Sequence, residues 1–144
     1  DNRVTLLGDK LIISANSDFV LMLDPNTGAT LRTSNFTTTR EPMIRGDQLI
    51  FGNFDGELIV ADKNLQEMSR SKISNNSITN IVHFKNHYVV TTTGGDIVLV
   101  DPQSLKVKET FNLGHSYSAV FGTAVSDGND MAIISSRNRL YFFK

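Results

Sequence analysis

Two histidines lie close enough in the sequence to suggest a metal site. His83 and His87 flank the turn Lys85-Asn86, so a hairpin could present both imidazoles to one cation. A zinc site in a protein uses three or four protein ligands. The chain has no Cys, and no third candidate ligand stands nearby in the sequence. We therefore interpret both as ordinary hairpin histidines and predict no metal site.

Other segments match ligand-binding motifs only in part. Asp24-Pro25-Asn26-Thr27-Gly28 begins like a calcium loop, which needs Gly at its sixth position and Glu at its twelfth. Here Gly is fifth and Asn35 is twelfth, so we interpret the segment as a turn.

Gly94-Gly95 lies between two predicted strands, whereas a phosphate cradle uses the amides at the start of a helix. Because no Gly-x-Ser-x-Gly elbow occurs either, we predict no catalytic residue, no cofactor and no enzymatic activity.

The composition limits the class of protein. The 144 residues include 14 Lys and Arg against 15 Asp and Glu, a net charge of −1. This balance argues against a nucleic-acid-binding surface and against a polybasic membrane anchor. Val, Ile and Thr total 35 residues, whereas Ala occurs six times, and 13 Asn and 10 Gly supply turn chemistry. We therefore predict a single all-β domain.

A repeat of about forty residues organises the chain. Each copy contains an apolar run, a short polar turn and a second apolar run, with the same internal length throughout; the four copies are 11–24, 49–62, 88–101 and 131–144. This pattern predicts two strands joined by a hairpin. A further strand precedes each copy, and the first three copies are followed by another. Four short strands per forty residues are typical of a β-propeller blade.

We name the strands A to D from the propeller axis outward. The predicted A strands are Val4–Leu7, Met43–Arg45, Ile78–Phe84 and Ala119–Val125, and the first D strand lies near Ala29–Thr33. The chain is thus one partial β-propeller domain, 1–144, with blades at about 3–36, 42–73, 78–113 and 119–144. The first three blades are complete, and the fourth has only strands A to C.

Three blades and three strands of a fourth do not close a ring. Propellers have about four to eight blades, and closure covers the apolar blade faces and the strand edges. We therefore expect an apolar face at each end and an unpaired edge on the last C strand. One explanation is a longer protein of seven or eight blades, whose N-terminal strand completes the last blade. The other is a second copy of the chain; a four-bladed ring would need a further strand ahead of Val4.

The turn Asp24-Pro25-Asn26-Thr27-Gly28 after an apolar strand resembles the PQQ-like, or quinoprotein-like, propeller repeat. In that family a strand ending in Asp is followed by Thr-Gly. The layout is most similar to the C-terminal half of the BamB-like lipoproteins of the bacterial outer-membrane β-barrel assembly complex. Shared features are Glu41-Pro42 at the entry to an A strand and the long connection 112–125. Two features depart from the family: Arg32 stands in place of its Trp, and Thr-Gly occurs in the first repeat alone.

Loops between D and A strands open on one face of a propeller, and such loops often carry function. Here they are 35–41, 74–79 and 112–118. The side chains in them best suited to directional contacts with a partner are Arg40, Glu41, His115 and Tyr117. The resemblance adds Asp1, which stands near the position of an acidic loop residue that contacts the barrel-forming subunit in that family.

The resemblance implies a non-catalytic scaffold that binds the barrel-forming subunit and supports assembly and insertion of outer-membrane β-barrel proteins. It also implies the periplasmic face of the outer membrane, as part of a longer lipidated precursor. Two alternatives stay open. The chain could be part of a PQQ-dependent quinoprotein dehydrogenase whose cofactor site lies elsewhere. It could also be a lumenal sensor ectodomain, for which glycans on the sequons at Asn35 and Asn75 would be the sign.

Overall fold

The computed structural model describes residues 3–14, 18–112 and 124–144. These residues form fifteen strands in four antiparallel sheets, and in every sheet the strands follow one another in sequence order. The described part of the chain holds no helix long and apolar enough to cross a membrane. The all-β prediction is therefore confirmed.

The strands have the following bounds. The first sheet contains β1 (Arg3–Leu7), β2 (Lys10–Ser14), β3 (Val20–Leu23) and β4 (Thr30–Thr33). The second contains β5 (Met43–Arg45), β6 (Gln48–Gly52), β7 (Glu57–Asp62) and β8 (Glu67–Lys72). The third contains β9 (Ile78–Phe84), β10 (His87–Thr92), β11 (Asp96–Val100) and β12 (Val107–Asn112). The fourth contains β13 (Val125–Ser126), β14 (Met131–Ile134) and β15 (Leu140–Phe143).

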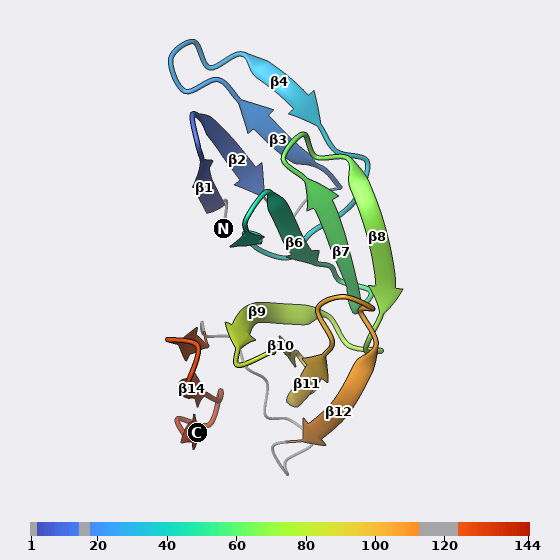
Figure 1. Ribbon diagram of the computed structural model, residues 1–144, viewed down its shortest axis with the longest axis vertical. Helices are drawn as coiled ribbons and strands as arrows, with labels where there is room; N and C mark the ends of the chain where they lie inside the picture. The colour runs from blue at the N-terminus through green and yellow to red at the C-terminus, as the bar shows by residue number, and fades with distance from the viewer. Residues whose placement is uncertain (1–2, 15–17, 113–123) are drawn as a thin grey trace.

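The four sheets are arranged as an arc of blades (Figure 1). The D strands β4, β8 and β12 lie along its convex outer side, and the A strands lie along its concave inner side. In the described part of the chain, three blades have four strands and the fourth has three, as the repeat predicts. Most of the predicted fourth A strand, Ala119–Val125, lies outside the described residues.

The predicted turns between A and B strands are present in all four blades. Each contains a residue in the left-handed region of φ: Gly8 (59°), Gly46 (57°), Lys85 (50°) and Gly128 (98°). The third turn adopts this conformation without a glycine. Tight turns between antiparallel strands need residues with left-handed φ. The turns predicted from Gly, Asn and Asp in the sequence therefore match the turns in the structure.

The hydrophobic core consists of three layers, one at each junction between successive blades. Strand alternation explains how one blade supplies two layers, because successive side chains point to opposite faces of a sheet. Leu49 and Ile50 in β6 are neighbours in sequence and both fully buried. Leu49 belongs to the layer that contains Ile12 of the first blade, whereas Ile50 belongs to the layer that contains Tyr88 of the third.

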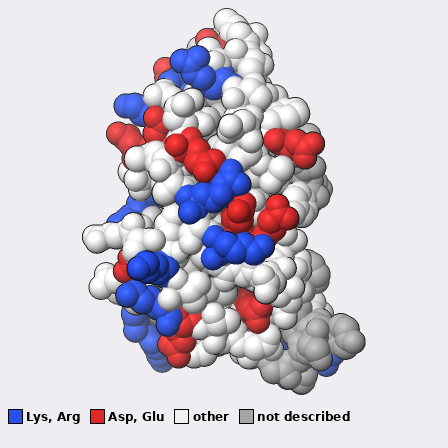
Figure 2. All heavy atoms as spheres, turned by 90° about the vertical axis from the view of Figure 1, so that its right-hand side faces the viewer, with Lys and Arg blue, Asp and Glu red and all other residues white. Residues whose placement is uncertain are grey.

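The outer side of the arc is polar and charged. Figure 2 shows acidic and basic side chains interspersed on this side. Arg70 on β8 binds two carboxylates, those of Glu57 and Glu67, each at 2.8 Å. The hydrogen bond to Arg70 is the main reason why the pKa of Glu67 is lowered. The D strands are exposed because no further strand covers them, and their polar sequences fit that position.

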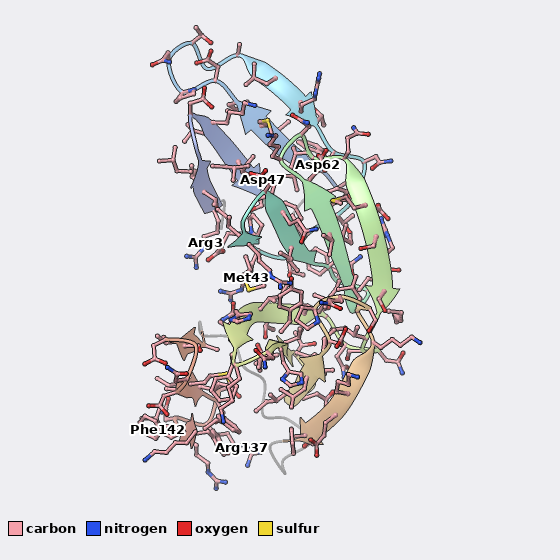
Figure 3. All side chains as sticks on the ribbon, viewed as in Figure 1. Arg3, Met43, Asp47, Asp62, Arg137 and Phe142 are labelled. Atoms are coloured by element: carbon pink, nitrogen blue, oxygen red, sulfur yellow. The ribbon has the colours of Figure 1, made fainter. Side chains whose placement is uncertain are left out.

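The two ends of the arc carry the apolar faces that the blade count leads one to expect. Leu6 on β1 is 64% exposed and Phe142 on β15 is 72% exposed. Figure 3 shows Phe142 at the far end of the arc from the first blade. Among the described strands, β15 pairs with β14 alone, so its other edge is open.

Candidate functional site

One end of the blades is formed by the D–A connections together with the B–C hairpin turns, and we call it the loop face. It comprises the connections 34–42 and 73–77 and the hairpin turns 53–56, 93–95 and 135–139. The connection 73–77 is hydrogen-bonded to two of these hairpin turns, to 53–56 through the Gly56 carbonyl oxygen and to 93–95 through the Thr93 N–H, which donates to the Ser77 carbonyl oxygen at 2.9 Å. The backbone of this part of the loop face is therefore fixed by hydrogen bonds between neighbouring blades.

The hairpin turn 53–56 is the most thoroughly fixed part of the loop face. The side-chain Oδ1 of Asn53 accepts hydrogen bonds from the backbone N–H groups of Asp55 (3.0 Å) and Glu57 (2.9 Å). Its Nδ2 donates to Glu57 Oε2 at 2.8 Å, which is the main reason why the pKa of Glu57 is lowered. Asn53 is buried, so its amide is committed to this turn.

The connection 73–77 closes over the same hairpin. The carbonyl oxygen of Gly56 accepts the backbone N–H groups of Ile73 (2.9 Å) and Ser74 (3.1 Å). Ser77 Oγ donates to the carbonyl oxygen of Phe54 at 2.8 Å. A side chain at Gly56 would meet the Ser74 carbonyl oxygen at 2.2 Å, so glycine is required for this close approach. The hairpin cannot move without breaking these bonds.

Threonines fix the connection 34–42 in the same way. Thr39 Oγ1 donates to the carbonyl oxygen of Ile78 at 2.7 Å, which joins this connection to the first residue of the third blade. The Thr39 backbone N–H donates to the Gly52 carbonyl oxygen at 2.9 Å. Thr38 is fully buried, and its Oγ1 donates to the Arg40 carbonyl oxygen at 2.7 Å. Short hydroxyl side chains at 38 and 39 thus hold the backbone on which Arg40 and Glu41 are placed.

Phe54 is an exposed aromatic residue of this face. It lies at the tip of the turn 53–56 and is 45% exposed, although its backbone is held on both sides. A large apolar ring on a rigid backbone can be buried by a partner at little entropic cost, and aromatic residues are enriched among binding hot spots. Sequence reasoning missed Phe54. The available signal was an aromatic residue inside the turn Asn53-Phe54-Asp55-Gly56, where polar residues are usual.

Two of the five predicted contact residues lie in described parts of the loop face. Arg40 and Glu41 are both partly buried on the connection between β4 and β5. Glu41 forms an ion pair with Arg3 of the first blade, at 3.7 Å between Oε2 and Nε. The carboxylate therefore lies across the junction of two blades, and Figure 3 shows Arg3 at the inner edge of the arc. Asp1, His115 and Tyr117 lie outside the described residues, so their contact role stays a prediction.

A cleft lies on the inner side of the arc. The inner strands β5, β9 and β13 enclose a cleft of about 450 Å³, lined by Met43, Ile44, Arg45, Ile81, Val82, His83 and Ser126. Arg45 is oriented by Tyr88: its Nη1 donates to the Tyr88 hydroxyl at 3.0 Å, and its guanidinium carbon lies 5.6 Å from the ring centroid. The cleft is largely apolar, and Arg45 supplies a cation at its edge.

The two histidines do not share a face. His83 is paired with Tyr88, and Phe84 is paired with His87, in the antiparallel register of β9 and β10. Directly opposed residues in such a pair point to the same side, and successive residues point to opposite sides. His83 and His87 therefore lie on opposite faces of the sheet, which is unsuitable for a shared metal ion.

The remaining motifs form turns. The Asp24 carboxylate accepts the backbone N–H of Asn26 at 2.7 Å, and Gly28 has a φ of 71°. A side chain at Gly94 would meet the Asn76 side chain of the neighbouring connection, and residues 93–95 form the turn between β10 and β11. Both predictions of a turn are confirmed. The sequon residues Asn35 and Asn75 are exposed, on successive D–A connections.

Comparison with known proteins identifies the fold. No family model and no curated protein matches the chain. Among solved structures, the chain is similar to the computationally designed Ika4 protein, with 15% identity and a TM-score of 0.80 over 97% of this chain and 88% of that one. It is similar to BamB from Moraxella catarrhalis (16%, TM-score 0.78, 99% of this chain, 42% of that one). It is also similar to the WD40 β-propeller domain of Doa1 (14%, TM-score 0.79, 100% of this chain, 50% of that one).

The chain thus spans half or less of the two natural proteins, and nearly the whole of the designed one. Identities of this size establish the fold alone, because one fold supports many functions. The described residues form part of a β-propeller, with three four-stranded blades and three strands of a fourth.

Proposed function

We propose that this chain is a non-catalytic scaffold that binds another protein through its loop face. The observation that carries the proposal is Phe54, an exposed ring at the tip of a hairpin whose backbone is fixed by Asn53 and by Ser77. A rigid, preformed surface loses little entropy on binding, which favours affinity. Arg40 and the pair of Arg3 with Glu41 add polar groups on neighbouring connections.

We propose further that the partner is the barrel-forming subunit of the outer-membrane β-barrel assembly complex. The scaffold would then support insertion of β-barrel proteins from the periplasmic face of the membrane, within a longer lipidated protein. Two features support this assignment: the resemblance of the repeat and layout to BamB-like lipoproteins, and the similarity in fold to BamB over 99% of the chain. The mechanism is shape and strand-edge complementarity, and no covalent bond is made or broken.

Direct binding tests the proposal. The purified chain is passed over the immobilised barrel-forming subunit in mild detergent, and affinities are measured for Phe54→Ala and Met68→Ala beside the unaltered chain. Met68 is a matched control because it is an exposed apolar residue on the outer strand β8, away from the loop face. We expect Phe54→Ala to weaken binding about ten-fold or more and Met68→Ala to leave it unchanged.

Two results would count against the proposal in different ways. If the unaltered chain does not bind the barrel-forming subunit, the assignment of the partner is wrong. If it binds and Phe54→Ala binds equally well, the loop face is not the docking surface. Circular dichroism of each variant checks that folding is retained, which is expected because both side chains are exposed.

A further inference from the structure

Arg45 and His83 lie on facing sides of the junction between the second and third blades. Arg45 comes two residues after Met43 in β5, and Met43 opposes Ile50, which belongs to the core between these blades. In β9, His83 opposes Tyr88, which belongs to the same core. Opposed residues lie on one face of a sheet, and residues two apart in a strand share that face. Arg45 therefore faces the third blade, and His83 faces the second.

Tyr88 holds the Arg45 guanidinium at this junction. Tyr88 is 1% exposed, and its hydroxyl accepts the hydrogen bond from Arg45 Nη1 at 3.0 Å. The guanidinium carbon also lies 5.6 Å from the centroid of the Tyr88 ring. In the part of the chain that the structure describes, no carboxylate forms an ion pair with Arg45. The guanidinium is thus held in place and keeps further N–H donors for an anion.

The three positions of Arg45, Tyr88 and His83 in the repeat carry no charge at the other two described junctions. Between the first and second blades they are Leu7, Leu49 and Ile44. Between the third and fourth blades they are Phe84, Met131 and Ser126. The residues in place of Arg45 are apolar and pack against the core of their own junction. Joining two blades therefore does not require a cation here, and Arg45 is available for another role.

Two clefts of different character meet at Arg45 and His83. The first is the cleft of about 450 Å³ between β5, β9 and β13, which also contains Met43 and Ile81. Figure 3 shows Met43 on the inner side of the arc, where the second blade meets the third. The second cleft holds about 320 Å³, and its other lining residues are Asn86, Asp101, Pro102 and Gln103. Both volumes are typical of small-molecule sites. A cation thus stands between an apolar cleft and a polar one.

Asp101 limits the charge that a ligand can carry into the second cleft. Its carboxylate accepts the backbone N–H groups of Gln103 (3.1 Å) and Ser104 (2.8 Å) and the hydroxyl of Ser104 (2.8 Å). The Asp101 charge is therefore stabilised within its own turn. A ligand with a second carboxylate in this cleft would be repelled by Asp101. The arrangement favours an anion with one carboxylate.

We propose that these clefts bind a small monocarboxylate with an apolar chain, of the class of the medium-chain fatty acids. The carboxylate lies between the Arg45 guanidinium and the His83 imidazole, and the chain lies in the first cleft beside Met43 and Ile81. A guanidinium binds a carboxylate through two parallel hydrogen bonds, and an imidazole N–H donates a third. Because Tyr88 already holds the guanidinium, little side-chain entropy is lost on binding.

This site is separate from the loop face. Arg45 directly precedes the turn between β5 and β6, and His83 lies next to the end of β9. Both are at the opposite end of their strands from the connections 34–42 and 73–77. The clefts are lined by residues of the second, third and fourth blades, so the proposal does not depend on what covers the end faces of the arc.

Calorimetric titration of the full-length protein with four small molecules tests the proposal. Octanoate has both the carboxylate and the apolar chain, acetate has the carboxylate alone, octanol has the chain alone, and octylammonium has the chain with the opposite charge. We expect octanoate to bind at one site, about ten-fold or more tightly than each of the other three.

Substitutions at two arginines locate the site. Arg45→Gln should weaken octanoate binding about ten-fold or more and abolish the preference for octanoate over octanol. Arg45→Lys keeps the charge without the planar fork, so its affinity should lie between those of Arg45→Gln and the unaltered protein. Arg32→Gln is the matched control, because Arg32 is an exposed arginine on the outer strand β4. It should bind octanoate normally, and circular dichroism checks that all three variants are folded.

Three results would overturn the proposal. The first is the absence of saturable octanoate binding by the unaltered protein. The second is equal affinity for octanoate and octanol, which would mean that the cleft does not recognise a carboxylate. The third is equal octanoate binding by Arg45→Gln and Arg32→Gln, which would place the octanoate elsewhere. All these titrations are made without a protein partner, so their outcome is independent of docking through the loop face.

Discussion

Leu105 offers a sharp test of how the turns between C and D strands are built. Its φ is 54°, in the left-handed region, and its side chain is only 4% exposed. It holds the place in the third repeat that Gly28 holds in the first, and both donate their backbone N–H to the Asp that begins the turn, at 2.9 and 2.8 Å. A leucine in this conformation costs about 1–2 kcal/mol. Burial of its side chain in the core between the second and third blades outweighs that cost.

We expect Leu105→Ala to lower the free energy of unfolding by about 2–4 kcal/mol, because it removes the buried side chain and keeps the strained φ. Leu105→Gly removes the same side chain but relieves the strain, by about 1–2 kcal/mol. The greater freedom of glycine in the unfolded chain offsets about 0.5–1 kcal/mol of that gain. Leu105→Gly should therefore be more stable than Leu105→Ala by about 0.5–1 kcal/mol, the difference between these two contributions.

Leu58 supplies the matched control. It is fully buried in the same core, on the regular strand β7, and its φ is not positive. There Leu58→Gly should be less stable than Leu58→Ala by about 0.5–1 kcal/mol. Urea unfolding followed by circular dichroism, at one protein concentration throughout, measures all four variants. If glycine is the less stable replacement at both positions, left-handed strain at Leu105 is not the explanation of this turn.

Two further perturbations follow from the loop geometry. Gly56→Ala should destabilise the protein by about 3 kcal/mol or more, because the new Cβ would collide with the Ser74 carbonyl oxygen. Gly8 has a similar φ but open space around it, so Gly8→Ala should cost about 1 kcal/mol. Thermal melts compare the two, and equal losses would contradict the collision. The pKa of Asp101 is lowered, chiefly by the backbone N–H of Ser104. Its stabilising effect should therefore be complete above about pH 5 and lost as the pH falls below about 4. The urea midpoint of Asp101→Asn should fall less between about pH 5 and about pH 3 than that of the unaltered chain, and an equal fall would contradict this.

The blades could be predicted from the sequence because their determinants are local. Alternation of apolar residues and the Asn, Asp and Gly turns set the strands, and Met43–Arg45 and Ile78–Phe84 match the predicted bounds. The apolar end faces followed from counting strands, and the exposed Leu6 and Phe142 bear this out. Each of these features depends on spacing within a single forty-residue repeat.

Contacts between repeats could not be predicted from the sequence. Glu41 was expected to lie in an open loop, but it pairs with Arg3 because the connection that precedes β5 lies beside β1 of the first blade. The loss of Thr-Gly in the later repeats looked like a departure from the motif. In the structure, Leu65 and Leu105 take left-handed conformations at those turns and use them to bury their side chains. Whether a buried side chain stabilises the protein by more than its left-handed backbone costs depends on the neighbouring blade against which that side chain packs.

The exposure of Phe54 also could not be predicted from the sequence. Nothing in the turn sequence states that the ring points to solvent, since that depends on how the connection 73–77 covers the hairpin. His83 and His87 show the opposite case. Strand alternation alone was sufficient to separate them once the register of β9 and β10 was known.

Photo-cross-linking in cells tests the scaffold account most directly. A photoreactive phenylalanine is placed at Phe54 in one sample and at Met68, on the outer strand, in the other. We expect a covalent adduct from position 54 with the barrel-forming outer-membrane subunit and none from position 68. The absence of any protein adduct at position 54, or equal adducts at both positions, would contradict docking through the loop face.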